Sequence, residues 1–177
     1  MSTTEVLIAG FGGQGILFAG KFLAYAGLLA GRNVSWLPSY GPEMRGGTAN
    51  CSVILSDKQV GSPIVSRPDI LIAMNLPSLD KYEAEVPAGG SIFVDSSLVS
   101  RKVMRTDVNA YYIPATALSN DKGYQTLANM ILMGHVIKKT SVIQEEMIAP
   151  AMAKVVSARH QDLLDKNIEA LKLGFDY

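Results

Sequence analysis

The sequence contains a single cysteine, Cys51, among its 177 residues. One thiol forms no disulfide within the chain and is too few to ligate an iron–sulfur cluster or a structural zinc ion. Cys51 lies among apolar residues, so we expect a buried, unreactive thiol. The lack of disulfides fits a reducing compartment, and we therefore expect a cytoplasmic protein.

Charged residues are also scarce, since Lys, Arg, Asp and Glu make up 18% of the chain, against about a quarter in typical globular proteins. A surface with few charges favours contact with partner proteins. The 16 basic and 16 acidic residues cancel, which leaves no positive field for nucleic acid or for an anionic membrane. The N-terminal residues are not basic and no apolar run reaches roughly 20 residues, so neither a secretory signal nor a membrane span is predicted.

Histidine is equally rare, with two residues, His135 and His160. Neither has an acid and a nucleophile nearby in sequence, so a hydrolase triad has no support. No pair of histidines or carboxylates has the spacing of metal ligands on one helix face. We expect no catalytic residue and no metal site on this chain.

Apolar runs bounded by turn residues predict the secondary structure. The predicted strands are 5–9, 34–37, 49–55, 69–74, 91–94 and 109–113, with a short return strand at 59–64 that makes the sheet mixed. The predicted helices are 14–30, 77–82, 115–120, 124–138 and 160–173, the last ended by Gly174. A further helix is predicted to begin with a capping box at Ser141 and Gln144 and to be interrupted at Pro150. This alternation indicates one α/β domain over residues 1–177: a three-layer αβα fold with a mostly parallel, mixed sheet and a helical C-terminal third.

A glycine turn follows the first predicted strand. Gly10, Gly12 and Gly15 match the pattern G-x-G-x-x-G between a strand and a helix, as in Rossmann folds. The free N–H groups at such a helix start attract a phosphate. An NAD(P) site would also need an acidic residue, or an arginine for a 2′-phosphate, near the end of the second strand, and residues 34–39 contain neither. A glycine turn needed only for close packing stays open as an alternative.

A second glycine-rich segment, residues 39–48, follows the second predicted strand. Arg45 is flanked in it by glycines, and its guanidinium fork suits a phosphate or a carboxylate. The alternative for Arg45 is a surface ion pair with Glu43. Tyr40 either stacks on a ligand or covers the sheet edge.

Asn75 and Asp95 follow two further predicted strands, and capping of the next turn is the simpler role for both. Ligands of α/β sheets bind beyond the carboxyl ends of strands. Both glycine segments lie at such ends, so we expect them to form one phosphate-binding rim.

Together the two glycine segments resemble the gamma subunits of 2-oxoacid:ferredoxin oxidoreductases. The resemblance covers essentially the whole chain and is most specific in residues 39–48. It also includes residues 69–75, Asn129, Met130, Gly134, Asn167, Ala170 and Gly174.

The resemblance implies a subunit of a complex that oxidatively decarboxylates a 2-oxoacid with coenzyme A to acyl-CoA, CO2 and reduced ferredoxin. Thiamine diphosphate and iron–sulfur clusters would lie on alpha, beta and delta (ferredoxin-like) partner subunits, with ferredoxin as the electron acceptor. This chain has no Gly-Asp-Gly motif for thiamine diphosphate and no cysteine cluster, which agrees. The 2-oxoglutarate form is the most similar, followed by the 2-oxoisovalerate form, and the pyruvate and indolepyruvate forms stay open.

The resemblance further assigns coenzyme A binding and active-site closure to this chain. Gly12, Gly13, Gln14 and Gly15 would cradle the coenzyme A diphosphate. Arg45, Gly46, Gly47 and Thr48 would close over it and face the thiamine site of a neighbouring subunit. Tyr40 and Asn75 complete the predicted set. A purely structural subunit, and a homodimer of the isolated chain, stay open.

Overall fold

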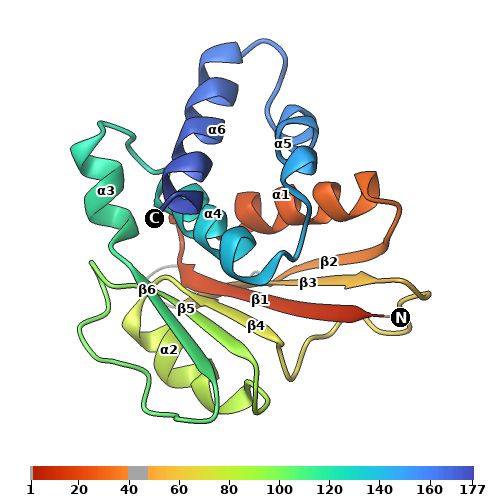
Figure 1. Ribbon diagram of the computed structural model, residues 1–177, viewed down its shortest axis with the longest axis vertical. Helices are drawn as coiled ribbons and strands as arrows, with labels where there is room; N and C mark the ends of the chain where they lie inside the picture. The colour runs from red at the N-terminus through yellow and green to blue at the C-terminus, as the bar shows by residue number, and fades with distance from the viewer. Residues whose placement is uncertain (1, 40–47) are drawn as a thin grey trace.

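A computed structural model describes residues 2–39 and 48–177. A six-stranded sheet with the order β2-β3-β1-β4-β5-β6 forms its centre (Figure 1). The strands are β1 (Thr3–Phe11), β2 (Asn33–Ser39), β3 (Thr48–Ser56), β4 (Ile70–Ala73), β5 (Ser91–Asp95) and β6 (Asn109–Ile113). The helices are α1 (Ile16–Leu29), α2 (Leu76–Tyr82), α3 (Ala115–Asp121), α4 (Ala128–Thr140), α5 (Ile148–Val155) and α6 (Gln161–Phe175), with 3-10 turns η2 (Glu83–Glu85) and η3 (Glu145–Met147).

The sheet is mixed, as predicted, but for a different reason. β1, β4, β5 and β6 pair in parallel, whereas β3 runs antiparallel to both β1 and β2. The predicted return strand at 59–64 is wrong, because these residues form an irregular connection. Pro63 lies in this segment and has no N–H to donate to a ladder, and Ile64 is 68% exposed rather than packed on a sheet face.

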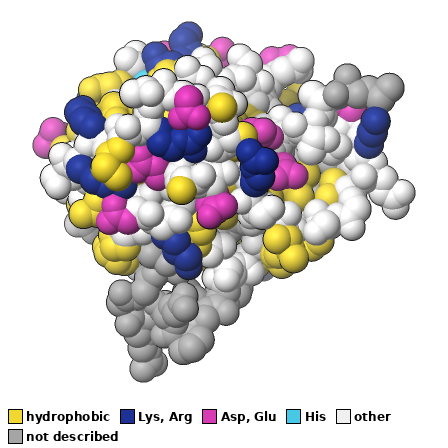
Figure 2. Space-filling view, turned by 90° about the horizontal axis from the view of Figure 1, so that it is seen from below, with side chains coloured by type: hydrophobic (Ala, Val, Ile, Leu, Met, Phe, Trp, Pro, Cys, Tyr) yellow, Lys and Arg dark blue, Asp and Glu magenta, His cyan; other side chains and the backbone are white. Residues whose placement is uncertain are grey.

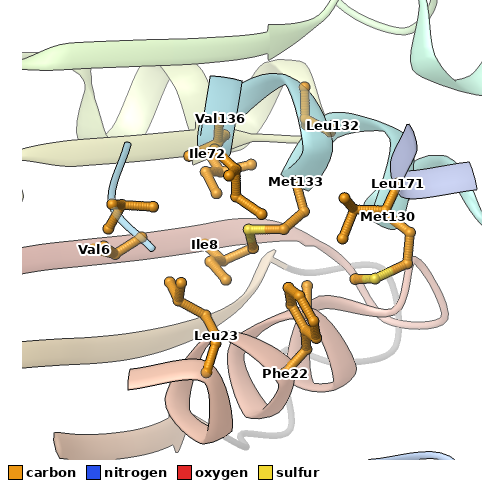
Figure 3. Close-up of a cluster of buried hydrophobic side chains, with 14 of the residues drawn as sticks. Val6, Ile8, Phe22, Leu23, Ile72, Met130, Leu132, Met133, Val136 and Leu171 are labelled. Carbon is orange, nitrogen blue, oxygen red and sulfur yellow. The ribbon is translucent and has the colours of Figure 1, made fainter. Parts of the chain in front are cut away.

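Helices cover both faces of the sheet, which confirms the three-layer architecture. Figure 1 shows α1, α4, α5 and α6 on one face and α2 on the other. Alternate residues of β1 therefore enter different cores: Val6 and Ile8 join the larger cluster, and Leu7 joins the smaller one. In the larger cluster, Phe22 and Leu23 of α1 point toward the sheet beside side chains of α4 (Figure 3).

Small residues let α1 lie close to the sheet, as its composition predicts. A Cβ atom added to Gly20 would lie 2.3 Å from the Sγ atom of Cys51 in β3. Cys51 is fully buried, and burial raises the pKa of its thiol to about 12. The predicted burial of this thiol is therefore confirmed, and the raised pKa favours the predicted lack of reactivity.

The helices α4 and α6 pack backbone to backbone. A Cβ on Gly134 would lie 1.9 Å from the carbonyl oxygen of Leu171, and one on Gly174 would lie 1.7 Å from that of Ile131. The prediction that Gly174 ends the last helix is wrong, since α6 continues to Phe175. Gly174 is required by the close approach of the two helices rather than by a helix end.

The predicted capping box at Ser141 and Gln144 does not form. Ser141 ends α4 with a φ of 51°, and no side chain caps the following η3 turn at Gln144. Pro150 also does not break a helix, because α5 begins at Ile148 and Pro150 falls in its first turn. A first-turn residue needs no intrahelical partner for its N–H, so proline is tolerated there.

Charges of both signs are mixed on the face that carries α2 (Figure 2). On this side Arg101 bridges Asp80 and Glu83, with Nη2–oxygen distances of 2.7 Å to each. The mixture leaves no single-sign field on this face, as the zero net charge predicts. No helix among residues 2–39 and 48–177 combines the length and apolar character needed to cross a bilayer.

Substitution of Gly174 by alanine should lower the free energy of unfolding by about 1–3 kcal/mol, because the new methyl group must push α6 away from α4. Chemical denaturation measures this change. Gly61→Ala is the matched control, since a Cβ there meets no atom within 4 Å and its φ is not in the left-handed region. Equal stability of the two variants would contradict the close crossing.

Cys51 should resist alkylation in the native protein. Its pKa of about 12 leaves almost no thiolate at pH 8, and the thiolate is the reactive form. Iodoacetamide labelling at pH 8, followed by mass spectrometry, should be slow in buffer and fast in denaturant. Equal rates in both conditions would show that the thiol is accessible in the native state.

Candidate functional site

The carboxyl ends of the parallel strands meet at one edge of the sheet. β1 leads there into the glycine loop, defined here as residues 12–15, and β4 leads there to Asn75. β5 ends there at Asp95. The predicted convergence of these three features is therefore confirmed. Ser39, the last residue of β2, joins the same edge, because it pairs with Asn50 of β3, which in turn pairs with β1.

The glycine loop has the backbone geometry that its sequence predicts. Gly13 and Gly15 have φ values of 89° and 74°, in the region that disfavours side chains. Gly15 is the N-cap residue of α1, where no side chain caps the helix and no acidic residue occupies the first turn. The first-turn N–H groups of α1 therefore lack a capping side chain, which suits an anion.

The Gln14 side chain braces this loop against the sheet. Its Oε1 atom accepts a hydrogen bond from the Phe11 N–H at 2.6 Å, and its Nε2 atom donates to the carbonyl of Met74 at 3.0 Å. A Cβ on Gly10 would lie 2.5 Å from that Oε1 atom, so glycine at position 10 leaves room for the brace. Because the Gln14 side chain is already engaged, ligand contacts at this position would come from the loop backbone.

Asn75 caps the next helix, the simpler of the two roles considered from sequence. Its Oδ1 atom accepts from the Ser78 N–H at 2.8 Å at the start of α2. Its Nδ2 atom is buried and has no partner among the described residues. The side chain thus keeps an NH2 group without a partner at the edge where the strands end.

Asp95 is also a structural residue. Its carboxylate, fully buried, accepts from the Thr116 hydroxyl at 2.6 Å and from the Thr116 N–H at 3.2 Å. It accepts as well from the Ser97 N–H at 3.1 Å. Asp95 therefore ties the end of β5 to the first turn of α3.

Most of the second predicted loop lies outside the described residues, including Tyr40, Arg45, Gly46 and Gly47. Thr48 is the first residue of β3 and pairs with Phe11, the last residue of β1. Thr48, the last residue of the second glycine-rich segment, therefore lies beside the start of the glycine loop.

Three cavities surround the glycine loop, and Gly13 lines all of them. Their volumes are about 190, 290 and 280 Å³. None of the residues that line them is charged. The first is lined by Gly13, Gln14, Met74, Leu98, Thr116, Ser119, Asn120, Thr126 and Ala128, the second by Gly13, Gly15, Phe18, Thr126, Leu127, Asn129 and Asn167, and the third by Phe11, Gly12, Gly13, Gly15, Ile16, Leu17, Phe18 and Ala49.

Sequence reasoning did not place Phe18, Thr126, Asn129 or Asn167 at this site. Thr126 has a φ of 69°, which is strained for a β-branched residue and has no sequence signature. Asn129 and Asn167 do carry a readable signal, because Asn129 interrupts an apolar run and Asn167 lies at helical spacing from Leu164 and Leu171. A buried amide needs partners, so such positions are candidates for polar contacts.

The remaining candidate chemistry finds no support in the described residues. No group of three or more His, Cys, Asp or Glu side chains there is arranged to hold a metal ion. His135 packs in the core against Phe93 and Tyr111, and burial lowers its pKa. β2 contains no acidic residue that could bind the ribose of a nicotinamide dinucleotide.

Known proteins resemble this chain over nearly its whole length. The family model described as pyruvate ferredoxin/flavodoxin oxidoreductase matches residues 5–177. The ketoisovalerate oxidoreductase subunit VorA of Methanothermobacter thermautotrophicus is 39% identical over 174 residues, which cover 98% of this chain and 36% of VorA. The 2-oxoglutarate synthase subunit KorC of Methanocaldococcus jannaschii is 33% identical over 175 residues, 97% of this chain and 92% of KorC.

Solved structures share the fold. The gamma subunit of a keto/oxoacid ferredoxin oxidoreductase from Geobacter sulfurreducens aligns with a TM-score of 0.83 at 30% identity and covers 98% of this chain and 96% of its own. A 2-oxoglutarate:ferredoxin oxidoreductase from Magnetococcus marinus, solved with 2-oxoglutarate, coenzyme A and succinyl-CoA, aligns with a TM-score of 0.87 at 22% identity. The alignment covers 98% of this chain and 30% of that one. The chain belongs to the pyruvate ferredoxin/flavodoxin oxidoreductase family and is of its gamma-subunit type.

Proposed function

We propose that this chain binds coenzyme A within a 2-oxoacid:ferredoxin oxidoreductase complex and helps to close the active site of that complex. The complex converts a 2-oxoacid and coenzyme A to acyl-CoA and CO2 and passes the electrons to ferredoxin. The observation that carries the proposal is the glycine loop, whose open backbone and uncapped α1 N-terminus lie at the edge where the strands end. Oxoacid, coenzyme A and acyl-CoA are bound together in the Magnetococcus enzyme of the same fold.

The backbone of Gly12, Gly13 and Gly15 would hold the coenzyme A diphosphate. A Cβ on Gly13 would meet no atom within 4 Å, so this side of the loop is open to a ligand. The first-turn N–H groups of α1 would donate to phosphate oxygens. The unused Nδ2 donor of Asn75 lies at the same edge of the sheet and would complete the set.

Arg45 would supply the positive charge. The residues lining the three cavities around the loop are uncharged, and a diphosphate needs a counter-charge. Gly46, Gly47 and Thr48 would close over the ligand beside Arg45, with Tyr40 stacked on it. Arg45 would then face the thiamine site of the neighbouring subunit.

The redox chemistry would reside on other chains. No group of three or more His, Cys, Asp or Glu side chains among the described residues is arranged to hold a metal ion, and Cys51 is the single cysteine of the sequence. In line with the family resemblance, we assign thiamine diphosphate and iron–sulfur clusters to alpha, beta and delta partner subunits. Thiamine diphosphate supplies the carbanion chemistry of decarboxylation when bound there, and this chain positions the acceptor thiol.

We assign 2-oxoglutarate as the substrate. The chain aligns with nearly the full length of KorC, a 2-oxoglutarate synthase subunit, but with about a third of VorA, a ketoisovalerate oxidoreductase subunit. The higher identity to VorA makes 2-oxoisovalerate the alternative. The assays that follow are run with both oxoacids.

Gly13→Ala should weaken coenzyme A binding by the complex by about 10-fold or more, because the methyl group would project into the open side of the loop. Gly31→Ala is the matched control: Gly31 also has a positive φ of 75° and open space, but it follows the far end of α1. Both variants carry the same backbone strain, so only the Gly13 variant should raise the KM for coenzyme A. Equal kinetics would favour a purely structural glycine turn.

Arg45→Ala should raise the KM for coenzyme A by about 10- to 100-fold, the loss expected for a charge-assisted phosphate contact. The variant should still co-purify with its partner subunits. Arg159→Ala, at an exposed residue before α6, should have no effect. Normal turnover of the Arg45 variant at limiting coenzyme A would show that Arg45 does not hold the diphosphate. Binding of NAD(P) instead of coenzyme A would favour the alternative of a nicotinamide dinucleotide site.

A further inference from the structure

Two buried asparagines beside the glycine loop have side-chain oxygens without a partner. Asn129 in α4 and Asn167 in α6 are each 5% exposed. Their Oδ1 atoms accept no hydrogen bond from any described residue. A buried acceptor left unpaired costs free energy, so each oxygen indicates a missing donor.

The orientation of both amides is fixed by the chain itself. Asn129 Nδ2 donates to the carbonyl of Gly15 at 3.0 Å, and Asn167 Nδ2 donates to the carbonyl of Leu163 at 2.7 Å. A carbonyl oxygen accepts but never donates, so each amide must turn its NH2 group toward it. The unpaired atoms are therefore acceptors, and exchanging nitrogen and oxygen would break both bonds.

Both asparagines line the same cavity of about 290 Å³, together with the glycine loop and Phe18. No lining residue is charged, and Phe18 and Leu127 give the cavity an apolar wall. Two carbonyl oxygens would repel a phosphate group. This cavity is therefore chemically different from the N-terminus of α1 and suits a neutral, flat group that donates two hydrogen bonds.

We propose that this cavity binds the amino-bearing purine base of the nucleotide ligand, with Asn129 Oδ1 and Asn167 Oδ1 accepting the two N–H bonds of its exocyclic amino group. The inference rests on the proposed function, which places the diphosphate of the same ligand on the adjacent glycine loop. An aromatic amine offers two donors on a flat apolar body. An amide N–H of the pantetheine arm offers one donor on a flexible chain and leaves the second oxygen unpaired.

The glycine at position 15 links the two halves of this site. A Cβ there would lie 2.3 Å from Asn129 Nδ2, and the Gly15 carbonyl is the acceptor that orients Asn129. The same residue thus shapes the phosphate side of the loop and positions the acceptor on the base side. The two asparagines are specificity residues for the base rather than catalytic residues.

The test compares coenzyme A with analogues that lack the two-donor amino group: the hypoxanthine analogue and 1,N6-etheno-coenzyme A. Calorimetry on the purified complex measures affinity. In the wild type we expect each analogue to bind about 10-fold more weakly than coenzyme A, the effect of one or two unpaired acceptors. In Asn167→Leu one acceptor is gone, so the affinity for coenzyme A should fall toward that for the analogues. The ratio of the affinity for coenzyme A to that for each analogue should then be about 3-fold or less.

Asn33→Leu is the matched control, because Asn33 is an exposed asparagine at the first residue of β2, away from the loop. It should keep the wild-type ratio. Thermal unfolding shows whether the Asn167→Leu variant is folded. If it is not, the comparison of coenzyme A with its analogues on the wild-type complex tests the base contact by itself. Analogues that bind as tightly as coenzyme A would mean that the cavity holds water only, which overturns the base contact and leaves the coenzyme A site intact. No coenzyme A binding at all would overturn the proposed function and this inference together.

Discussion

The amide brace of Gln14 sets the position of the candidate site. It joins the N–H of Phe11, where β1 ends, to the carbonyl of Met74, beyond the end of β4. Asn129 reaches from α4 to hold the carbonyl of Gly15 on the other side of the loop. The four-residue loop is thus fixed by three elements that are far apart in the sequence, and each tie needs a glycine whose missing Cβ leaves room for it.

The brace also explains why the loop offers backbone rather than side chains to a ligand. The Gln14 side chain faces the sheet, and Gly13 turns toward the three cavities with a positive φ. A loop held in this way is preorganised, so a ligand does not have to order it. The phosphate side depends on the free N–H groups of α1, and the base side depends on the oriented oxygens of Asn129 and Asn167.

The fold was predictable from sequence where the signal is local. Apolar runs located all six strands, and G-x-G-x-x-G located the turn between β1 and α1. Two of the errors arose where a local rule met a tertiary constraint. Gly174 has the pattern of a helix stop but serves the contact with Ile131, and Ser141 has the pattern of a helix start but ends α4. No local signal distinguishes these cases, because the deciding atoms belong to another element.

The same distinction applies to the site. The glycine loop and the cap at Asn75 follow from strand–turn–helix signals, and the structure places both at the predicted edge. Asn129 and Asn167 enter the sequence interpretation only through the family resemblance, because an asparagine in a helix usually faces solvent. Their burial, and the cavity they share, exist only once α4 and α6 have packed together.

The uncharged lining of the cavities has a consequence for assembly. Helix N–H groups contribute only a partial positive charge, equivalent to about half an elementary charge, which falls off within a turn. A coenzyme A diphosphate would need more than this. If the loop binds that group as proposed, the counter-charge comes from Arg45 or from a neighbouring subunit. Binding by the isolated chain would then be weaker than binding by the complex, which agrees with a chain whose own surface carries few charges.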